Sequence, residues 1–174
     1  MTTRVKIIVS ANEMLLIREY KASDRNACIA IFKSNMPLYF APEEFPLLEN
    51  WLDSKDKNEI AYKNNHAEHF YVVEKNSKIV ACGGFYLTNE DDAKMTWGMV
   101  ENSFHKKGIG KEFLLYRLEE IRQLYPDCII SLDTSQHTYS FFEKMGFSVT
   151  KISKDAYGEG LDRYDMLLNK KGAM

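Results

Sequence analysis

The chain has 174 residues, 45% of them hydrophobic and 13% aromatic, which is enough for one well-buried core but short for two. We therefore expect a single domain over residues 1–174. The formal net charge of −2 argues against a general nucleic-acid binder, whose domain would be strongly basic. No apolar run approaches a membrane span and the first ten residues lack a signal-peptide core, so we expect a cytoplasmic protein without a membrane segment.

Apolar runs between turn residues predict strands, and apolar residues at helical spacing predict helices. In chain order, the predicted strands span 14–19, 70–74, 79–87, 93–101, 128–132, 147–152 and 163–168. The first predicted helix begins at Ser23 and ends near Pro37, and two more lie within 42–65. Another runs from about 108 to 125, and the last carries Tyr139, Phe142 and Met145 before Gly146. Residues 1–13 remain as an N-terminal extension. This alternation of strands and helices after a hairpin indicates an α/β sandwich around a mixed sheet.

Side chains that commonly bind metals do not form a recognisable motif. Cys28, Cys82 and Cys128 are far apart and lack CxxC spacing, so we expect reduced, mostly buried thiols. His66 and His69 have HxxH spacing but neither a cysteine partner nor the HExxH signature. The sequence therefore predicts no metal site.

The most informative stretch is 100–111, where a polar turn with two glycines joins the strand 93–101 to the helix 108–125. Gly108 and Gly110 allow a tight turn and a close approach of a ligand to the backbone. The helix N-terminus presents unpaired N–H groups and the positive end of its dipole, which suit an anion. Lys106, Lys107 and Lys111 add positive charge around the turn. We interpret residues 105–111 as a phosphate cradle.

Two well-known phosphate-binding motifs are excluded here. A P-loop of the form GxxxxGK[ST] would need glycine at His105 and a hydroxyl residue at Glu112. A GxGxxG dinucleotide motif would need glycine at Phe113. What remains is a short GxG turn without a metal-binding hydroxyl, which suits a pyrophosphate held by backbone amides.

The segment from His105 to Gly110 resembles the [Q/R]xxGxG[A/G] motif of the GNAT superfamily of N-acyltransferases, except that His105 replaces Gln or Arg. A second block, 140–147, resembles the FYEKxGF segment of the same family. The order of elements agrees over nearly the whole chain, apart from the first dozen residues and the last few. The resemblance implies a GNAT-like α/β fold with a mixed, mostly antiparallel central sheet flanked by helices on both faces.

The resemblance also implies acetyl-CoA as co-substrate and an amine as acceptor, with direct attack in a ternary complex. In the family, the pantetheine arm inserts between the strand before the cradle and the strand after its helix, and the helical region 42–65 forms one wall of the acceptor site. The residues that would then contact acetyl-CoA are Met99, Val100, His105, Lys106, Lys107, Gly108, Ile109, Gly110, Lys111 and Phe142. Backbone N–H groups near Met99 would stabilise the oxyanion of the reaction.

The catalytic side chains depart from the family pattern. Many members use the Tyr of FYEK as the acid, but Phe142 stands there, and no carboxylate lies within 93–100. Tyr139, one helical turn earlier, is the substitute candidate for the acid, or it packs with Phe142 and Met145. The candidates for the base are Glu101, Asp133 and His137, all near strand ends.

Several alternatives stay open. The segment 157–166 is either a shaped loop over the acceptor site or a plain turn with solvated charges. A non-catalytic acyl-CoA-binding module is the alternative function, favoured by the missing tyrosine and strand glutamate. The acceptor could be a polyamine, an amino acid, an aminoglycoside or a protein amine, and an exposed strand edge makes a homodimer possible.

Overall fold

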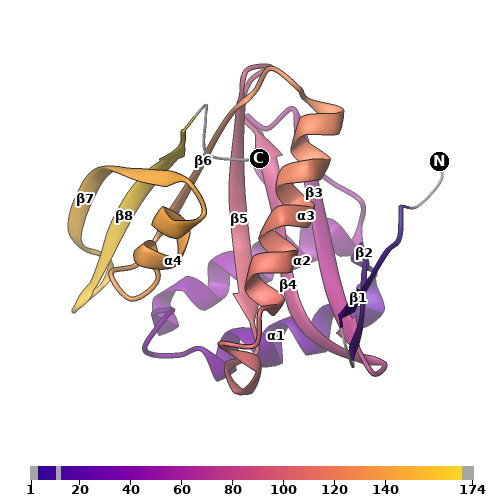
Figure 1. Ribbon diagram of the computed structural model, residues 1–174. Helices are drawn as coiled ribbons and strands as arrows, with labels where there is room; N and C mark the ends of the chain where they lie inside the picture. Colours follow the sequence, from indigo (N-terminus) through magenta and orange to yellow (C-terminus); the bar gives the residue numbers. More distant parts are fainter. Residues whose placement is uncertain (1–3, 11–12, 170–174) are drawn as a thin grey trace.

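The computed structural model describes residues 4–10 and 13–169, and within them the chain folds around an eight-stranded sheet (Figure 1). In spatial order the strands are β1 (Lys6–Ser10), β2 (Glu13–Glu19), β3 (Ala67–Lys75), β4 (Lys78–Leu87), β5 (Asp92–Val100), β6 (Ile129–Thr134), β8 (Leu161–Leu168) and β7 (Phe147–Gly158). Neighbouring strands are antiparallel except β5 and β6, which are parallel. The parallel pair is connected by a helix, as such crossovers require.

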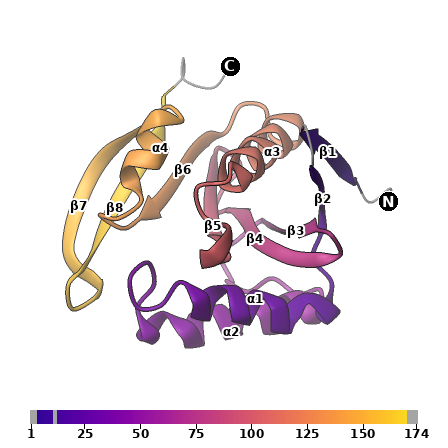
Figure 2. The same ribbon diagram turned by 60° about the horizontal axis from the view of Figure 1, so that its bottom comes forward.

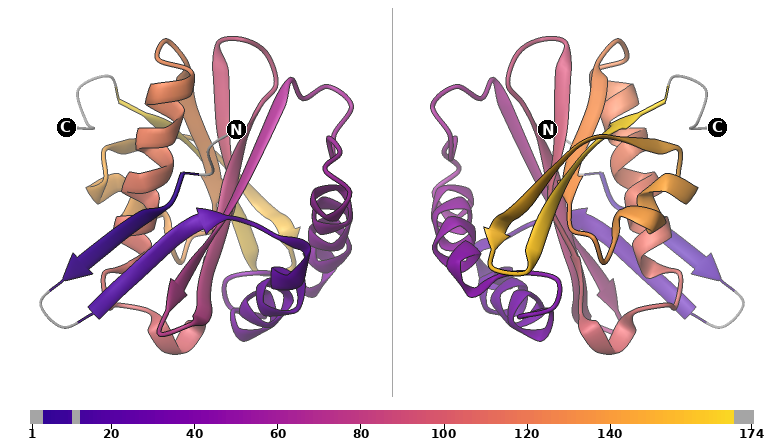
Figure 3. Two further views of the ribbon diagram at one scale, coloured as in Figure 1. Left: turned by 90° about the vertical axis from the view of Figure 1, so that its right-hand side faces the viewer. Right: turned by 90° about the vertical axis from the view of Figure 1, so that its left-hand side faces the viewer.

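Four helices cover the two faces of the sheet, with short 3₁₀ turns between elements. They are α1 (Arg25–Ser34), α2 (Phe45–Asp56), α3 (Ile109–Leu124) and α4 (Tyr139–Lys144), and the 3₁₀ turns are η1 (Ala22–Asp24), η2 (Pro42–Glu44) and η3 (Asn102–Phe104). Helices α1 and α2 lie on one face and α3 and α4 on the other (Figures 2 and 3). Each face has its own core: Trp51 is fully buried beneath the first pair, and Leu114 beneath α3. The predicted fold class is confirmed.

Some predicted boundaries were wrong for local reasons. No second helix follows α2, because residues 57–66 form turns that lead into β3. Ser23 is not the N-cap of α1, since η1 precedes the helix and the Asp24 carboxylate accepts the capping bond from Lys21 N at 2.8 Å. Much of the predicted loop 153–160 is strand: β7 continues to Gly158, and the hairpin turns at residues 159 and 160.

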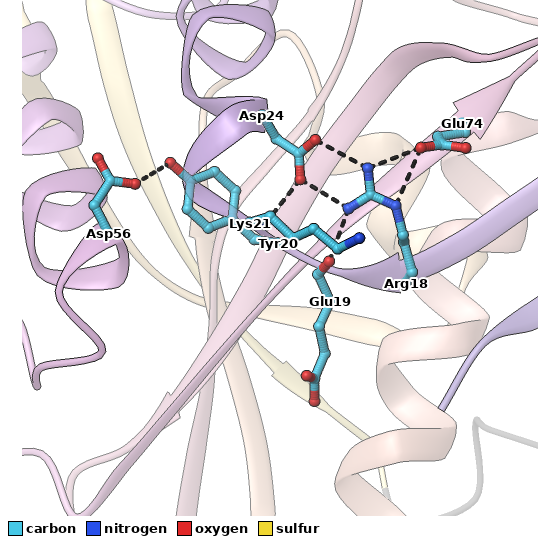
Figure 4. Close-up of polar contacts among 7 residues, drawn as sticks. All are labelled: Arg18, Glu19, Tyr20, Lys21, Asp24, Asp56 and Glu74. Atoms are coloured by element: carbon cyan, nitrogen blue, oxygen red, sulfur yellow. Dashed lines mark hydrogen bonds and ion pairs between the residues drawn. The ribbon is translucent and has the colours of Figure 1, made fainter. Parts of the chain in front are cut away.

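A partly buried network of ion pairs and hydrogen bonds fixes the helices α1 and α2 against the sheet (Figure 4). Arg18 of β2 donates to both oxygens of Asp24, at 2.8 and 2.9 Å, and to Glu74 of β3 at 2.8 Å. Next along the chain, the Tyr20 hydroxyl donates to Asp56 at the end of α2, at 2.6 Å. Bidentate arginine contacts of this kind fix orientation as well as adding energy. Arg18 and Tyr20 therefore link β2 and the residue after it to the start of α1 and the end of α2.

An irregularity in β5 lies at the centre of the sheet. Gly83 of β4 is opposite two residues of β5, Trp97 and Gly98, so β5 carries a β-bulge. Trp97 has a φ of +50°, which is uncommon for a bulky residue. Gly84 beside it allows close strand contact, because an added Cβ would lie 1.9 Å from His69 O. The bulge occurs just where β5 leaves its parallel neighbour.

Candidate active site

Strands β5 and β6 pair over only the first part of β5. The paired residues are Asp92 to Lys94 with Ile129 to Ser131, and β6 then continues beside β8 alone. From the bulge at Trp97 to Val100, the edge of β5 that faced β6 therefore has no strand partner within the described part of the chain. Unpaired backbone N–H and C=O groups at such an opening can bind an extended ligand in the manner of an added strand.

The phosphate cradle lies at the end of β5, where α3 begins. Gly108 is the N-cap and has a φ of +82°, a left-handed conformation that favours glycine. Helical hydrogen bonding in α3 starts with Glu112 N donating to Gly108 O at 3.1 Å, so the N–H groups of the first turn face outward. A Cβ added to Gly110 would lie 3.7 Å from Val100 Cγ2 and 3.9 Å from Phe141 Cζ, which is ordinary contact.

The Val100 carbonyl is held by two side chains from different parts of the chain. Asn35 Nδ2, at the end of α1, donates to Val100 O at 2.9 Å, and His105 Nε2 lies 2.9 Å from the same oxygen. Asn35 is only 3% exposed, so this contact is part of the core. Glu101 N donates to Val80 O, so the backbone groups of Val100 face away from β4, toward the opening. The Met99 side chain is buried beneath α1 and α2.

The lysines of the cradle are exposed, as an anion site requires. Lys106 has a left-handed backbone with a φ of +61°. Lys107 Nζ lies 5.2 Å from the centre of the Phe104 ring, and Lys75 and Lys78 approach the same ring from the β3–β4 turn at 5.2 and 5.3 Å. Lysines from two turns therefore gather around the Phe104 ring, and two of them, Lys75 and Lys78, are also paired with Glu13 and Glu101.

The three candidate bases lie in different surroundings. Glu101 pairs with Lys78 at 3.1 Å, on the side of the β3–β4 turn. Asp133 of β6 pairs with Lys94 at 2.7 Å and accepts a hydrogen bond from Tyr157. Burial acts to raise the pKa of Asp133, but the Lys94 ammonium outweighs it and holds the pKa below its ordinary value. This carboxylate is thus already neutralised by a partner.

His137 is exposed in the turn between β6 and α4, and Tyr39 connects it to the cradle. The Tyr39 ring makes edge contacts with His105, at 5.2 Å between centroids, and with His137, at 6.3 Å. Tyr39 belongs to the connection between α1 and α2, so this aromatic row crosses from that connection to both sides of the β5–β6 opening. The sequence offered no signal for Tyr39, because nothing local marks a loop aromatic as part of a site.

The aromatic residues of helix α4 pack against partners that the sequence did not predict. Tyr139 stacks on Tyr164 of β8, with ring centroids 4.6 Å apart, and not on Phe142. Phe142 packs edge-on against Phe147 at 5.9 Å. Phe141 is the residue of α4 that approaches Gly110 in the cradle. The Tyr139 ring is therefore held by stacking on β8.

Glu44 is a candidate base that the sequence reasoning missed. It lies in η2, before α2, and its Oε2 accepts a hydrogen bond from Ala41 N at 2.8 Å. Burial raises the pKa of Glu44 to about 7, and the nearby negative charge of Asp133 adds to the rise. The local signal was a glutamate three residues after Ala41, with Pro42 at the start of the turn; only the glutamate half of a capping box is possible here, because alanine has no side-chain acceptor.

The β7–β8 hairpin and η2 meet over the same side of the opening (Figures 2 and 3). A Cβ added to Gly158 at the end of β7 would lie 3.0 Å from Ala41 Cβ and 3.4 Å from Glu43 Oε2. Tyr157, the residue before it, reaches Asp133. The opening is therefore bordered by backbone on the cradle side and by charged side chains on the η2 side.

A parallel pair of strands that separates beside a glycine-rich helix start defines an acyltransferase of the GNAT type. Residues 29–147 match the acetyltransferase (GNAT) family, and the chain belongs to this family. It is accordingly an enzyme of the acyltransferase class. No curated protein has a sequence that matches this chain.

Solved structures with the same fold are distant in sequence. The ribosomal-protein-S18-alanine N-acetyltransferase from Escherichia coli has a TM-score of 0.69 and 16% identity, over 92% of this chain and 96% of that chain. The ribosomal-protein-alanine N-acetyltransferase from Brucella melitensis has a TM-score of 0.67 and 16% identity, over 87% and 97%. A GNAT acetyltransferase from Elizabethkingia anophelis with acetyl-CoA bound has a TM-score of 0.65 and 15% identity, over 89% and 97%.

Two further observations concern the described residues only. None of their helices has the length and apolar character needed to cross a membrane. Nor do their His, Cys, Asp and Glu side chains gather in a group of three or more that could hold a metal ion.

Proposed function

We propose that this protein transfers the acetyl group of acetyl-CoA to a primary amine by direct attack in a ternary complex. The observation that carries the proposal is the separation of β5 from β6 beside the cradle at the end of β5. The first-turn amides of α3 and the lysines of the cradle would hold the pyrophosphate. The pantetheine would lie along β5, with the thioester near the bulge at Trp97 and Gly98.

The amine must lose a proton before it attacks. A lysine-like amine with a pKa near 10.4 is only about 0.1% neutral at pH 7.4, so a nearby base increases the reactive fraction. We propose Glu44 for this role, because a carboxylate whose pKa is about 7 is suited to accept a proton at neutral pH. The partners of Glu101 and Asp133 make these two carboxylates weaker candidates. His137 is the second candidate, because it is exposed beside Tyr39.

The leaving thiolate needs a proton, and Tyr139 is the candidate acid. In this chain Phe142 cannot donate, and Tyr139 carries the hydroxyl of α4 that lies one helical turn away. Its stack on Tyr164 fixes the ring, which would hold the hydroxyl in one place. The Tyr139→Phe variant is expected to lower turnover while CoA affinity stays within about two-fold, and adding Phe142→Tyr should restore part of the loss.

The acceptor class is best determined directly. Thiol release from acetyl-CoA would be followed with polyamines, amino acids, aminoglycosides and peptides, including a peptide with N-terminal alanine. This peptide is included because two structural neighbours act on a ribosomal-protein alanine. CoA binding would be measured by calorimetry on the same sample. Turnover with one class supports the proposal, whereas CoA binding without turnover on any amine supports an acyl-CoA-binding module, and no CoA binding contradicts both.

A further inference from the structure

Arg117 is a buried cation that forms no ion pair with any described residue. It lies in α3 and is only 5% exposed. Its one hydrogen bond among the described residues is long, from Nε to Phe113 O at 3.5 Å. The guanidinium carbon lies 4.4 Å from the centre of the Phe113 ring, and no carboxylate in the described part of the chain forms an ion pair with it. Buried charges are normally paired, so this one needs an explanation.

The guanidinium lies against the sheet at the β5 bulge. A Cβ added to Gly98 would be 2.9 Å from both Nη1 and Nη2, and one added to Gly83 would be 2.8 Å from Nη1. Two glycines on adjacent strands therefore make the space that the charge occupies. Gly98 is part of the bulge, beyond the last paired residue of the β5–β6 ladder, Lys94. The charge thus lies directly behind the strand segment where the thioester would be bound.

The neighbours of Arg117 do not neutralise it. The titratable groups that face it are Cys82 and Tyr71. The hydrogen bond of Cys82 with Cys28, together with burial, raises the pKa of Cys82, and burial raises the pKa of Tyr71, so both are uncharged at neutral pH. Burial lowers the pKa of Arg117 to about 10, which leaves it protonated. A methionine would fill similar space without the cost of burying a charge.

We propose that Arg117 is an electrostatic positioning residue for the acyl-transfer step, acting from behind the Gly98 segment on negative charge that develops at the thioester. This proposal rests on the proposed function. When the amine nitrogen bonds to the carbonyl carbon, the C=O electron pair moves to oxygen, and a proton leaves the nitrogen for the base. When the C–S bond then breaks, its electron pair stays on sulfur as the thiolate, which is protonated in turn. A fixed cation in a poorly solvated region favours both anions.

The pKa of the CoA thiol in its complex with the protein tests the proposed role of Arg117, and this measurement does not require the acceptor to be known. This pKa would be measured by titrating thiolate absorbance in complexes with the parent protein, with Arg117→Met and with Arg117→Gln. Loss of the cation is expected to raise this pKa by about one pH unit in both variants. Arg117→Lys, which keeps a charge with a shorter reach, should give an intermediate value. Two neutral variants of different polarity are included in case one of them fails to fold.

Thermal unfolding separates this role from a packing role. Because an unpaired buried charge is removed, Arg117→Met is expected to melt at the same temperature as the parent protein or higher, while turnover falls about ten-fold. An unchanged thiol pKa in either neutral variant, with CoA still bound, overturns the proposal and leaves the proposed function intact. Failure of the parent protein to bind CoA overturns both.

Discussion

The donor side of the proposed site is made largely of backbone, whereas the acceptor side is made of side chains from elements that are far apart in the sequence. On the donor side, the cradle needs two glycines, a helix N-terminus and an unpaired strand edge within residues 95–111. On the acceptor side, Glu44, Asp133 and Tyr157 come from η2, β6 and β7. The first arrangement depends on local conformation, and the second depends on how the tertiary fold brings separate elements together.

This difference explains why the family resemblance identifies the donor and not the acceptor. Backbone amides bind the same pyrophosphate in every protein that forms the same turn. Side chains in the connection between α1 and α2 and in the β7–β8 hairpin can change without altering the sheet, because loops and hairpin tips lie at the surface. If Glu44 is the base, as we propose, substrate specificity in this chain should depend on the side chains around it.

The largest effect is expected from a change on the acceptor side. Glu44→Gln should lower kcat/KM for the amine about 100-fold, because the proposed base is removed, while CoA affinity stays within about two-fold. In the parent enzyme, kcat/KM should rise with pH and level off above about 7, as Glu44 loses its proton, and the variant should lose this rise. Steady-state kinetics across pH measures both.

Glu43→Gln is the matched control, since it removes the same charge from the exposed neighbouring residue. It should keep the rise of kcat/KM with pH, with only a small downward shift of the midpoint, because the Glu43 charge contributes to the raised pKa of Glu44. A similar loss of kcat/KM in both variants would contradict the assignment. Stability gives a further check. Because the pKa of Glu44 is raised above the ordinary value of about 4.3, the folded state binds the extra proton between about pH 4.3 and 7. This group's contribution to the unfolding free energy should fall as pH rises through that window.

A change on the donor side should have a smaller effect, and it should alter CoA affinity instead of the pH dependence of kcat/KM. Gly110→Ala is expected to weaken CoA binding about ten-fold, because a Cβ beside Val100 and Phe141 would hinder the close approach of the ligand to the first turn of α3. The unfolding free energy should stay level or rise by up to about 1 kcal/mol, since the Cβ makes only ordinary contacts and alanine favours the helix. Calorimetry with CoA and chemical denaturation measure the two quantities.

Gly84→Ala is the control for that experiment. Its Cβ would collide with the His69 backbone, so it should lower the unfolding free energy by about 3 kcal/mol. If Gly110→Ala instead behaved like Gly84→Ala, with lost stability and unchanged affinity per folded molecule, the glycine would be structural and the cradle assignment would be wrong.

The smallest effect is expected from Glu101→Gln. Glu101 belongs to a partly exposed pair with Lys78, and such pairs contribute about 0 to 1 kcal/mol to stability. Turnover and CoA affinity should each remain within about two-fold of the parent values. A ten-fold loss of turnover would show that the donor side also supplies a catalytic carboxylate, which would remove the contrast between the two sides.

The sequence predicted the elements whose signals are local. The strands around the β3–β4 turn follow from apolar runs, and the start of α3 follows from Gly108. Two predictions of helix boundaries failed. Asp24, not Ser23, is the N-cap residue of α1, because Ser23 lies within η1, and the polar run after α2 forms turns that lead into β3. The Asn35 contact with Val100 joins residues 65 positions apart and had no local sign.

By itself, the sequence determined the family, the order of elements and the glycine turn at which α3 begins, because glycine conformation and helix dipoles act within a few residues of the chain. Only the tertiary structure decided which side chains share the site. Burial raises the pKa of Glu44 and takes the Arg117 guanidinium out of solvent, and burial is a property of the packed molecule. The catalytic candidates therefore depend on the fold as a whole, while the cradle depends on one turn.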